Sequence, residues 1–244
     1  SPAALVLDVK VGTGAFMKEI GAARDLAEAL VATAGAAGCR TSALITDMSQ
    51  PLVPSLGNAL EVAEVMRALT GKGSGALVQL SAALGGVVLC DAGLVADVQE
   101  GADRIAAALS DGRVAERFGR MVAAQGGPVR FIDDWARFLP EATVIREVTA
   151  QEAGVVQAID GEALGLAVVA LGGGRQVESD VIDPAVGLSG IARLGTKLSR
   201  GQPIATIHAG RESQAKQAEA AVRAAIRIGD GPVEVPELIR ERIG

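Results

Sequence analysis

The 244-residue sequence is long enough for one large domain or two modest domains, each with its own hydrophobic core. Hydrophobic residues make up 49% of the chain and charged residues 21%, which argues against a disordered protein. Aromatic residues are only 2%, so the core must be built from Ala, Val, Leu and Ile, a composition that suits helices packed on a parallel sheet. The net charge of −6, without a visible basic patch, argues against a nucleic-acid-binding protein.

The cysteines and the longest apolar run indicate in which cellular compartment the protein is expected. Cys39 and Cys90 lie far apart, each in an apolar setting, so we expect buried free thiols in a reducing compartment. The longest weakly polar run, residues 75–90, is shorter than the roughly 20 residues that a membrane-spanning helix needs. No signal peptide is visible. These features predict a soluble, cytoplasmic protein without a membrane partner.

The beginning of the chain predicts a strand, a helix and a second strand. Residues 5–11 have the pattern of a buried strand, and the Gly-x-Gly of residues 12–14 follows them. Apolar positions then recur at spacings of three and four over about 20 residues, which predicts a helix that ends near Gly35 and Gly38. Residues 41–46 are a second short apolar strand. This order implies parallel strands joined by a right-handed crossover.

Helices dominate the next stretch, up to about residue 139. Residues 47–57 contain two prolines, which forbid regular structure and predict a loop. Asn58 is a good N-cap and Glu61 completes a capping box, so we expect a helix to begin at Asn58. The helical patterns that follow are interrupted by turn signals at residues 91–93, 111–112 and 126–128.

The composition changes after Pro140, and we place a domain boundary near residues 140–150. The elements predicted beyond it are a strand-turn-strand over residues 144–159, a short helix over 162–171, a glycine-rich stop at 172–175, a small β unit over 186–207 and an amphipathic helix over 213–228. Glycines mark the tight turns of the β unit. The chain is therefore predicted to be α/β with a smaller second domain.

Residues 5–18 are the first candidate for a functional segment. Asp8 and Lys10 share one face at the carboxyl end of the first strand, which is where ligands bind in open α/β sheets. Gly12 and Gly14 allow the backbone to approach a ligand closely. Taken alone, a Gly-x-Gly after a strand is more often a plain turn.

Four ordered motifs resemble the thymidine and pyrimidine-nucleoside phosphorylases, and the similarity covers essentially the whole chain. The motifs are residues 5–18, residues 46–52 with 57–62, residues 121–127 and residues 171–175; residues 180–187 and 207–209 agree as well. The resemblance implies an α/β fold in two parts. Residues 1–140 correspond to the C-terminal half of the phosphorylase domain, a partial mixed or parallel sheet with flanking helices. Residues 145–244 correspond to a smaller α+β domain with a barrel-sandwich-like β unit.

The resemblance implies phosphorolysis, in which inorganic phosphate attacks the anomeric carbon of the (deoxy)ribose and the pyrimidine base leaves. Residues 118–120 and 131–140 are more similar to the thymidine-preferring bacterial branch, which predicts conversion of thymidine and phosphate to thymine and 2-deoxyribose 1-phosphate. A broad-specificity pyrimidine-nucleoside phosphorylase is the alternative. Family members are homodimers with phosphate as co-substrate, and no organic cofactor is expected. Anthranilate phosphoribosyltransferase shares the fold class, but residues 8–16 and the C-terminal domain argue against that relative.

Most of the family's catalytic groups have no counterpart in this sequence. The phosphate loop with its Lys and Ser, the base-clamping Arg, Ser and Lys, and a His near the base all precede the strand that opens this chain. Ser1-Pro2 leads directly into that buried strand, without the neighbours that a central parallel strand needs. We therefore expect a truncated chain without phosphorolytic activity of its own. A non-catalytic fragment with a structural or binding role fits the same residues.

Two sets of site residues carry over from the resemblance. Phe16 matches the position where the family places an apolar side chain against the pyrimidine ring; the alternative is a core residue under the first helix. Some broad-specificity relatives bind a monovalent cation such as potassium through two backbone carbonyls and a helical Glu, which correspond to Leu52, Ser55 and Glu64. Ser55 replaces a small apolar residue, a change that a backbone ligand tolerates. Glu64 is equally well explained as an exposed helix carboxylate.

Three other polar features have structural explanations. His208, the only histidine, does not match the family's active-site His, and we expect a structural imidazole at a strand end. Residues 172–175 follow the C-terminal end of a helix, where the dipole repels anions, so they predict a helix stop rather than a phosphate loop. Lys197 lacks the flanking residues of a biotin or lipoate attachment site, so a carrier function is not expected.

Overall fold

The computed structural model describes residues 2–73 and 75–244; Ser1, at which the first predicted domain begins, lies outside them. The chain divides into two compact units. The first unit comprises the residues up to 48 together with 66–132 and 236–244, and the second comprises 49–65 and 133–235. The architecture is mixed α/β with three small sheets and no closed barrel among the described residues, which confirms the predicted fold class.

The two units are discontinuous in sequence and so do not coincide with the continuous ranges predicted above. The loop that begins at Ser49 belongs to the second unit, because its backbone pairs with residues near Leu188. The C-terminal strand belongs to the first unit, because it pairs with the second strand of the chain. Neither long-range pairing has a local sequence signal.

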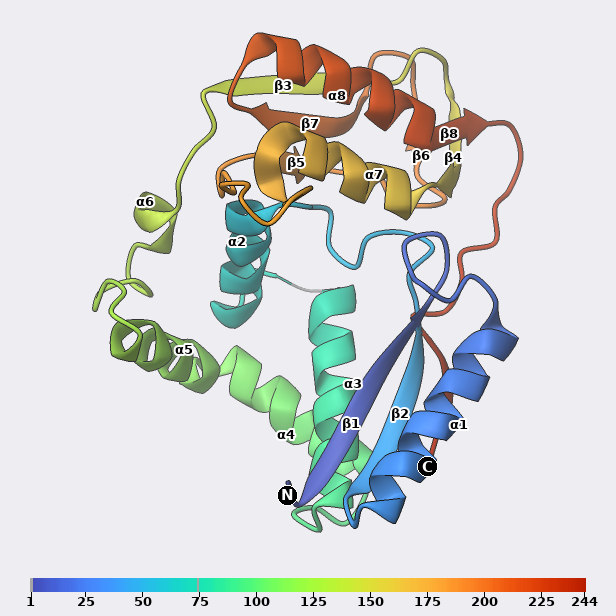
Figure 1. The fold of residues 1–244 in the computed structure, drawn as a ribbon, viewed down its shortest axis with the longest axis vertical. Helices are drawn as coiled ribbons and strands as arrows, with labels where there is room; N and C mark the ends of the chain where they lie inside the picture. Colours follow the sequence, from blue (N-terminus) through green and yellow to red (C-terminus); the bar gives the residue numbers. More distant parts are fainter. Residues whose placement is uncertain (1, 74) are drawn as a thin grey trace. The chain divides into compact units, whose positions relative to one another are not determined.

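The first unit contains a three-stranded sheet in the order β1-β2-β9 (Figure 1). β1 (Ala4–Val11) and β2 (Arg40–Asp47) are parallel, with Val9 opposite Ile45, and α1 (Ile20–Ala36) connects them. These three elements confirm the predicted strand, helix and strand. β9 (Ile239–Ile243) pairs antiparallel with β2 and was not predicted from the sequence.

The two faces of this sheet are covered by different helices. One face packs on α1 through small and branched apolar side chains. Its buried members are Val9, Val11, Ala23, Ala27, Ala43 and Ile45. Because side chains alternate along a strand, Ser42 lies on the other face, where its hydroxyl donates to Asp91 at 2.7 Å. Asp91 is the last residue of α3 (Ala76–Asp91), so α3 covers that second face.

The remaining helices follow the predicted turn signals, with one correction at a cap. They are α2 (Asn58–Leu69), α4 (Val98–Ser110), α5 (Arg113–Ala124) and α6 (Trp135–Phe138). α2 begins at the predicted residue, but the Asn58 amide donates to the Gly173 carbonyl at 3.0 Å instead of capping its own helix. The Glu61 carboxylate accepts from the Gly57 backbone N–H at 2.9 Å, one residue before the predicted N-cap, so the bond predicted at Asn58 is made to Gly57 instead.

The second unit contains two three-stranded antiparallel sheets, β3-β7-β5 and β6-β4-β8. Their strands are β3 (Val144–Thr149), β4 (Gly154–Ile159), β5 (Gly187–Ser189), β6 (Lys197–Leu198), β7 (Pro203–Ala209) and β8 (Ile226–Gly229). The predicted strand-turn-strand is present, but β3 and β4 join different sheets. The last helix, α8 (Glu212–Ala225), ends earlier than predicted, because Ile226 and Ile228 pair with β4 as strand residues.

A single apolar core joins these sheets to α7 (Gly161–Val168) and α8. Its fully buried members include Val148, Val156, Ile159, Leu164, Val186, Leu188, Ile204, Ile207 and Val222. α7 continues into a π-helical turn, η1 (Val169–Gly173), that ends where Gly172 adopts a φ of 100°. The glycine-rich segment is therefore the helix stop that the sequence predicts.

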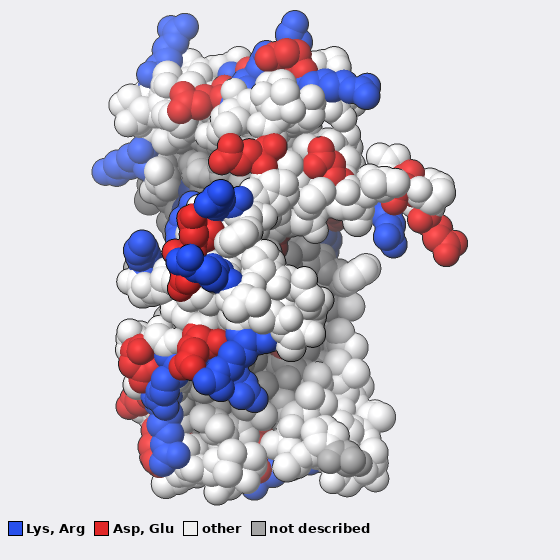
Figure 2. Space-filling model, turned by 90° about the vertical axis from the view of Figure 1, so that its left-hand side faces the viewer, with Lys and Arg blue, Asp and Glu red and all other residues white. Residues whose placement is uncertain are grey.

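Surface charge is mixed in sign on the face drawn in Figure 2, where basic and acidic side chains are interspersed. Ion pairs along helices α4 and α5 include Arg104 with Glu100 and Arg120 with Glu116, both at 2.6 Å. Among the described residues, no helix is both long and apolar enough to cross a membrane.

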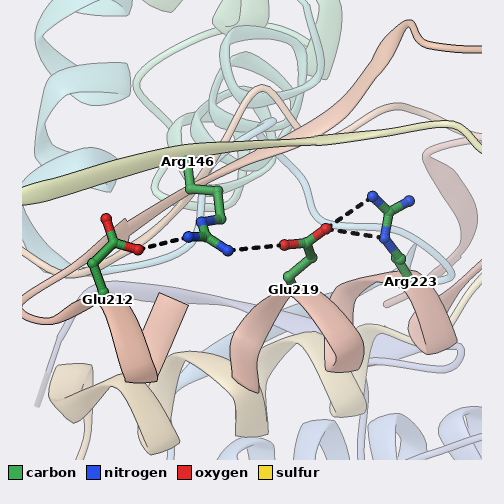
Figure 3. Close-up of polar contacts among 4 residues, drawn as sticks. All are labelled: Arg146, Glu212, Glu219 and Arg223. Atoms are coloured by element: carbon green, nitrogen blue, oxygen red, sulfur yellow. Dashed lines mark hydrogen bonds and ion pairs between the residues drawn. The ribbon is translucent and has the colours of Figure 1, made fainter. Parts of the chain in front are cut away.

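A chain of alternating charges ties β3 to α8 (Figure 3). Arg146 of β3 lies 2.6 Å from Glu212 and 3.3 Å from Glu219, and Glu219 lies 2.9 Å from Arg223. Arg223 also donates to the Thr149 carbonyl at the end of β3. Hydrogen bonds from Arg223 and from Arg146 hold the pKa of Glu219 below its ordinary value of 4.5, against the opposing effect of burial.

We predict that Glu219→Gln lowers the thermal midpoint at pH 7 by roughly 2–4 °C, equivalent to about 1 kcal/mol in a chain of this size. A carboxylate with a lowered pKa in the folded state stabilises above its unfolded pKa, and this stabilisation is lost as the pH falls through the folded pKa. The difference between wild type and variant should therefore shrink below pH 4.5. Calorimetry between pH 3 and pH 7 measures it. Glu178→Gln, at an exposed position, is the matched control and should leave the midpoint unchanged at every pH.

A close backbone contact inside the second unit predicts that a methyl group added at Gly57 strongly destabilises the protein. Gly57 has a φ of 126°, and a Cβ atom there would lie 2.5 Å from the Val186 carbonyl oxygen. We expect Gly57→Ala to destabilise the protein by about 2–4 kcal/mol, measured by urea denaturation. Gly35→Ala in α1 meets no atom within 4 Å and should instead stabilise by about 0.5–1 kcal/mol. Equal effects of the two substitutions would contradict the importance of this contact.

Candidate functional site

The carboxyl ends of β1 and β2 carry a charged cluster in the first unit. The Lys10 ammonium lies 2.6 Å from the Asp8 carboxylate and donates to the Thr46 hydroxyl at 2.9 Å. The Thr46 hydroxyl in turn donates to Asp8 at 2.5 Å. Thr46 is fully buried, whereas the side chains of Asp8 and Lys10 remain 26% and 29% exposed. The sequence correctly placed Asp8 and Lys10 on one face, and parallel pairing brings Thr46 opposite Lys10.

The loop after β1 is held by backbone hydrogen bonds to the end of β2. The Met48 N–H donates to the Val11 carbonyl at 2.7 Å, and the Gly14 N–H donates to the Met48 carbonyl at 2.9 Å. The Gly12 N–H closes the loop on the Met17 carbonyl at 3.0 Å. These three hydrogen bonds fix the backbone of the loop before α1 begins.

This fixed loop presents Phe16 to solvent. Its side chain is 99% exposed, the largest exposure of any large hydrophobic residue described. The alternative reading of Phe16 as a core residue under α1 is therefore wrong. An exposed aromatic ring on a rigid loop, at the sheet edge where α/β proteins bind ligands, is suited to stacking against a flat heterocycle.

The predicted cation ligands all lie in the second unit, in two neighbouring pieces of chain. The Ser55 hydroxyl is buried and donates to the Glu64 carboxylate at 2.9 Å. Glu64 is accordingly a partly buried, hydrogen-bonded group rather than an exposed helix carboxylate. The Leu52 carbonyl instead accepts from Arg193 at 3.3 Å. The structure brings Ser55 and Glu64 together and places a guanidinium at the third predicted ligand.

No described group of three His, Cys, Asp or Glu side chains could hold a metal ion. A site built from backbone carbonyls is not of that kind, so the ligand set Leu52, Ser55 and Glu64 remains a prediction. The residues that sequence reasoning missed around it are Gln50, whose side chain accepts from the Leu194 N–H at 3.1 Å, and Arg193. The signal that could have drawn attention to Gln50 is its place inside the two-proline loop, directly before Pro51.

The lone histidine is part of the β structure of the second unit. His208 of β7 lies opposite Gly187 of β5, and its Nε2 atom is 2.8 Å from the Ser189 hydroxyl. Burial lowers the pKa of His208 below its ordinary value of 6.5, so the imidazole is neutral at pH 7. Cys39 is a buried free thiol as predicted, whereas Cys90 is free but only partly buried.

Two family models match the chain, one in each predicted half. Residues 1–115 match the glycosyl transferase family a/b domain, and residues 155–229 match the pyrimidine nucleoside phosphorylase C-terminal domain. These two domains in this order are characteristic of one group of enzymes. The group is the thymidine and pyrimidine-nucleoside phosphorylase family, the family that the sequence motifs resemble.

The two matches connect the described clusters to a class of chemistry. The enzymes are of the glycosyltransferase type, with a nucleoside and phosphate as substrates. The a/b domain match contains β1, β2, the Asp8–Lys10–Thr46 cluster and Phe16. The C-terminal domain match contains most of the two antiparallel sheets and all of α8. The exposed aromatic loop therefore lies within the matched a/b domain.

We predict that Thr46→Val destabilises the protein by about 1.5–3 kcal/mol, because it removes hydrogen bonds to two charged groups at a buried position. Valine has nearly the same shape as threonine, so packing should be preserved. Thr46→Ser keeps the hydroxyl and should recover most of the loss. Urea denaturation followed by far-UV circular dichroism measures both variants. A valine variant as stable as the serine variant would show that the hydroxyl does not organise the cluster.

Proposed function

We propose that this protein is a thymidine phosphorylase component, in which residues 1–244 supply the wall that holds the pyrimidine base. In the reaction, a phosphate oxygen forms a bond to C1′ of the deoxyribose while the C1′–N1 bond breaks. The electron pair of that bond leaves with thymine, which takes up a proton, and 2-deoxyribose 1-phosphate is formed. The observation that carries the proposal is the exposed Phe16 ring on a backbone-fixed loop, inside a chain of this family.

The proposed role of each residue follows from its exposure and from the charges that it already contacts. Phe16 presents an uncovered aromatic face, and stacking on a base is worth roughly 1–3 kcal/mol. Lys10 is already paired with Asp8 and Thr46, so its charge holds the end of the sheet rather than a phosphate. Phosphate needs further cations and backbone donors that the described clusters do not supply. We therefore propose that the 244-residue chain alone binds a base weakly and does not complete phosphorolysis.

The proposed preference for thymidine and the proposed cellular context rest on the sequence. Residues 118–120 and 131–140 resemble the thymidine-preferring branch, and Phe118 packs against Phe131 with ring centroids 6.3 Å apart. Two free cysteines, one buried and one partly buried, suit a reducing cytoplasm. Homodimerisation is proposed from the family resemblance alone.

The test uses the four phenylalanines of the chain, replaced by 4-fluorophenylalanine. We expect thymidine and thymine to shift one ¹⁹F resonance, that of Phe16, because the three other rings lie outside the loop. Phe16→Leu assigns that resonance and should abolish the response. Phe138→Leu, at a position 42% exposed, is the matched control and should leave the response intact. No shift of the Phe16 resonance at any thymidine concentration would contradict the proposal.

Two further measurements separate the remaining possibilities. Equal responses to uridine and thymidine would favour the broad-specificity alternative. Phosphate-dependent release of thymine by the purified 244-residue chain would contradict the proposed dependence on additional groups. A chain that responds to no nucleoside would support a purely structural role.

A further inference from the structure

The loop over residues 49–57 is docked along residues 184–194 by a series of backbone contacts within the second unit. Leu56 and Leu188 exchange both backbone hydrogen bonds at 2.8 Å, and the Ile191 N–H donates to the Pro54 carbonyl at 3.0 Å. The Gln50 side chain extends the series to Leu194. The loop therefore has a fixed backbone, and the directions of its carbonyl groups are set by that backbone.

Two consecutive carbonyls of this loop converge on one atom. Nη1 of Arg193 lies 3.3 Å from the Leu52 oxygen and 3.5 Å from the Pro51 oxygen. Two carbonyl dipoles directed at one point form a site of negative potential, which a cation compensates. The guanidinium carries a permanent positive charge, since arginine does not deprotonate in proteins. Arg193 belongs to residues 184–194, the same segment along which the loop is docked.

We propose that the Arg193 guanidinium is the built-in cation of this loop and takes the position that the family resemblance assigned to a monovalent cation. The residues present do not fit potassium bound through the Leu52 carbonyl. A second positive charge at that oxygen would be repelled by the guanidinium. Ser55 and Glu64 satisfy each other by a hydrogen bond, which leaves the loop organised without an added ion. This inference does not depend on the proposed nucleoside substrate.

The experiment is a potassium titration of the ¹³C-labelled 244-residue chain, read at the backbone carbonyl resonances of Pro51 and Leu52. Choline chloride at equal ionic strength removes the general effect of salt. We expect no saturable shift with potassium in the wild-type chain. In Arg193→Gln, potassium should produce a saturable shift at both carbonyls that choline does not produce. Removal of the guanidinium should also lower the thermal midpoint by roughly 1–2 °C in choline chloride, since the side chain is exposed and its hydrogen bonds are long.

Control variants make the outcome specific to this guanidinium. Arg193→Lys retains the charge and should stay insensitive to potassium. Arg200→Gln removes an exposed arginine elsewhere in the β unit and should behave as wild type. Arg193→Met replaces the glutamine variant if that variant does not fold. A saturable potassium shift in the wild-type chain would overturn the proposal, as would a folded Arg193→Gln or Arg193→Met chain that remains insensitive to potassium.

Discussion

The parallel pairing of β1 with β2 is the constraint on which the first unit depends. Parallel strands bring their carboxyl ends to the same sheet edge, and here that edge collects Asp8, Lys10 and Thr46 within hydrogen-bonding distance. The same pairing brings Met48 beside Val11, which fixes the loop that follows β1. A one-residue slip in register would turn Thr46 to the opposite face and release the loop. The fixed backbone of the loop that carries Phe16 thus depends on strand register.

The second unit depends on a different constraint, the close approach of two backbones. Residues 56 and 57 pass so near 186–188 that no side chain fits between them, and glycine occupies both Gly57 and Gly187. This approach lets Leu56 and Leu188 pair as a bridge between segments more than a hundred residues apart. It also orients the preceding carbonyls of Pro51 and Leu52 toward Arg193. A loop that the sequence marks only by its prolines becomes an ordered part of the β structure.

Much of the fold could be predicted from the sequence, and the failures share a cause. β1, α1, β2, the start of α2 and the ends of α3, α4 and α5 were predicted because each carries a local periodicity or its own turn residues, whereas the separation of α2 from α3 was not predicted. β9 was missed because Ile239–Ile243 has three consecutive charged residues between two isoleucines, which is not a strand pattern, and because its partner lies almost two hundred residues away. The end of α8 was misplaced because Ile226 and Ile228 continue the helical stripe while pairing with β4. At the site, Asp8, Lys10 and Phe16 followed from local pattern and resemblance. Thr46 and Arg193 required knowledge of which strands and loops lie side by side.

The cations of both clusters already have partners within the protein. Lys10 is compensated by Asp8, and Arg193 is directed at two carbonyl dipoles, so both cations serve the polypeptide itself. A cation that already has its counter-charge contributes little to holding a dianion such as phosphate, because a phosphate would have to displace that partner. The apolar ring of Phe16 in the first unit is, in contrast, 99% exposed. These two clusters are therefore consistent with the proposal that this part of the protein contacts a neutral, flat base rather than phosphate.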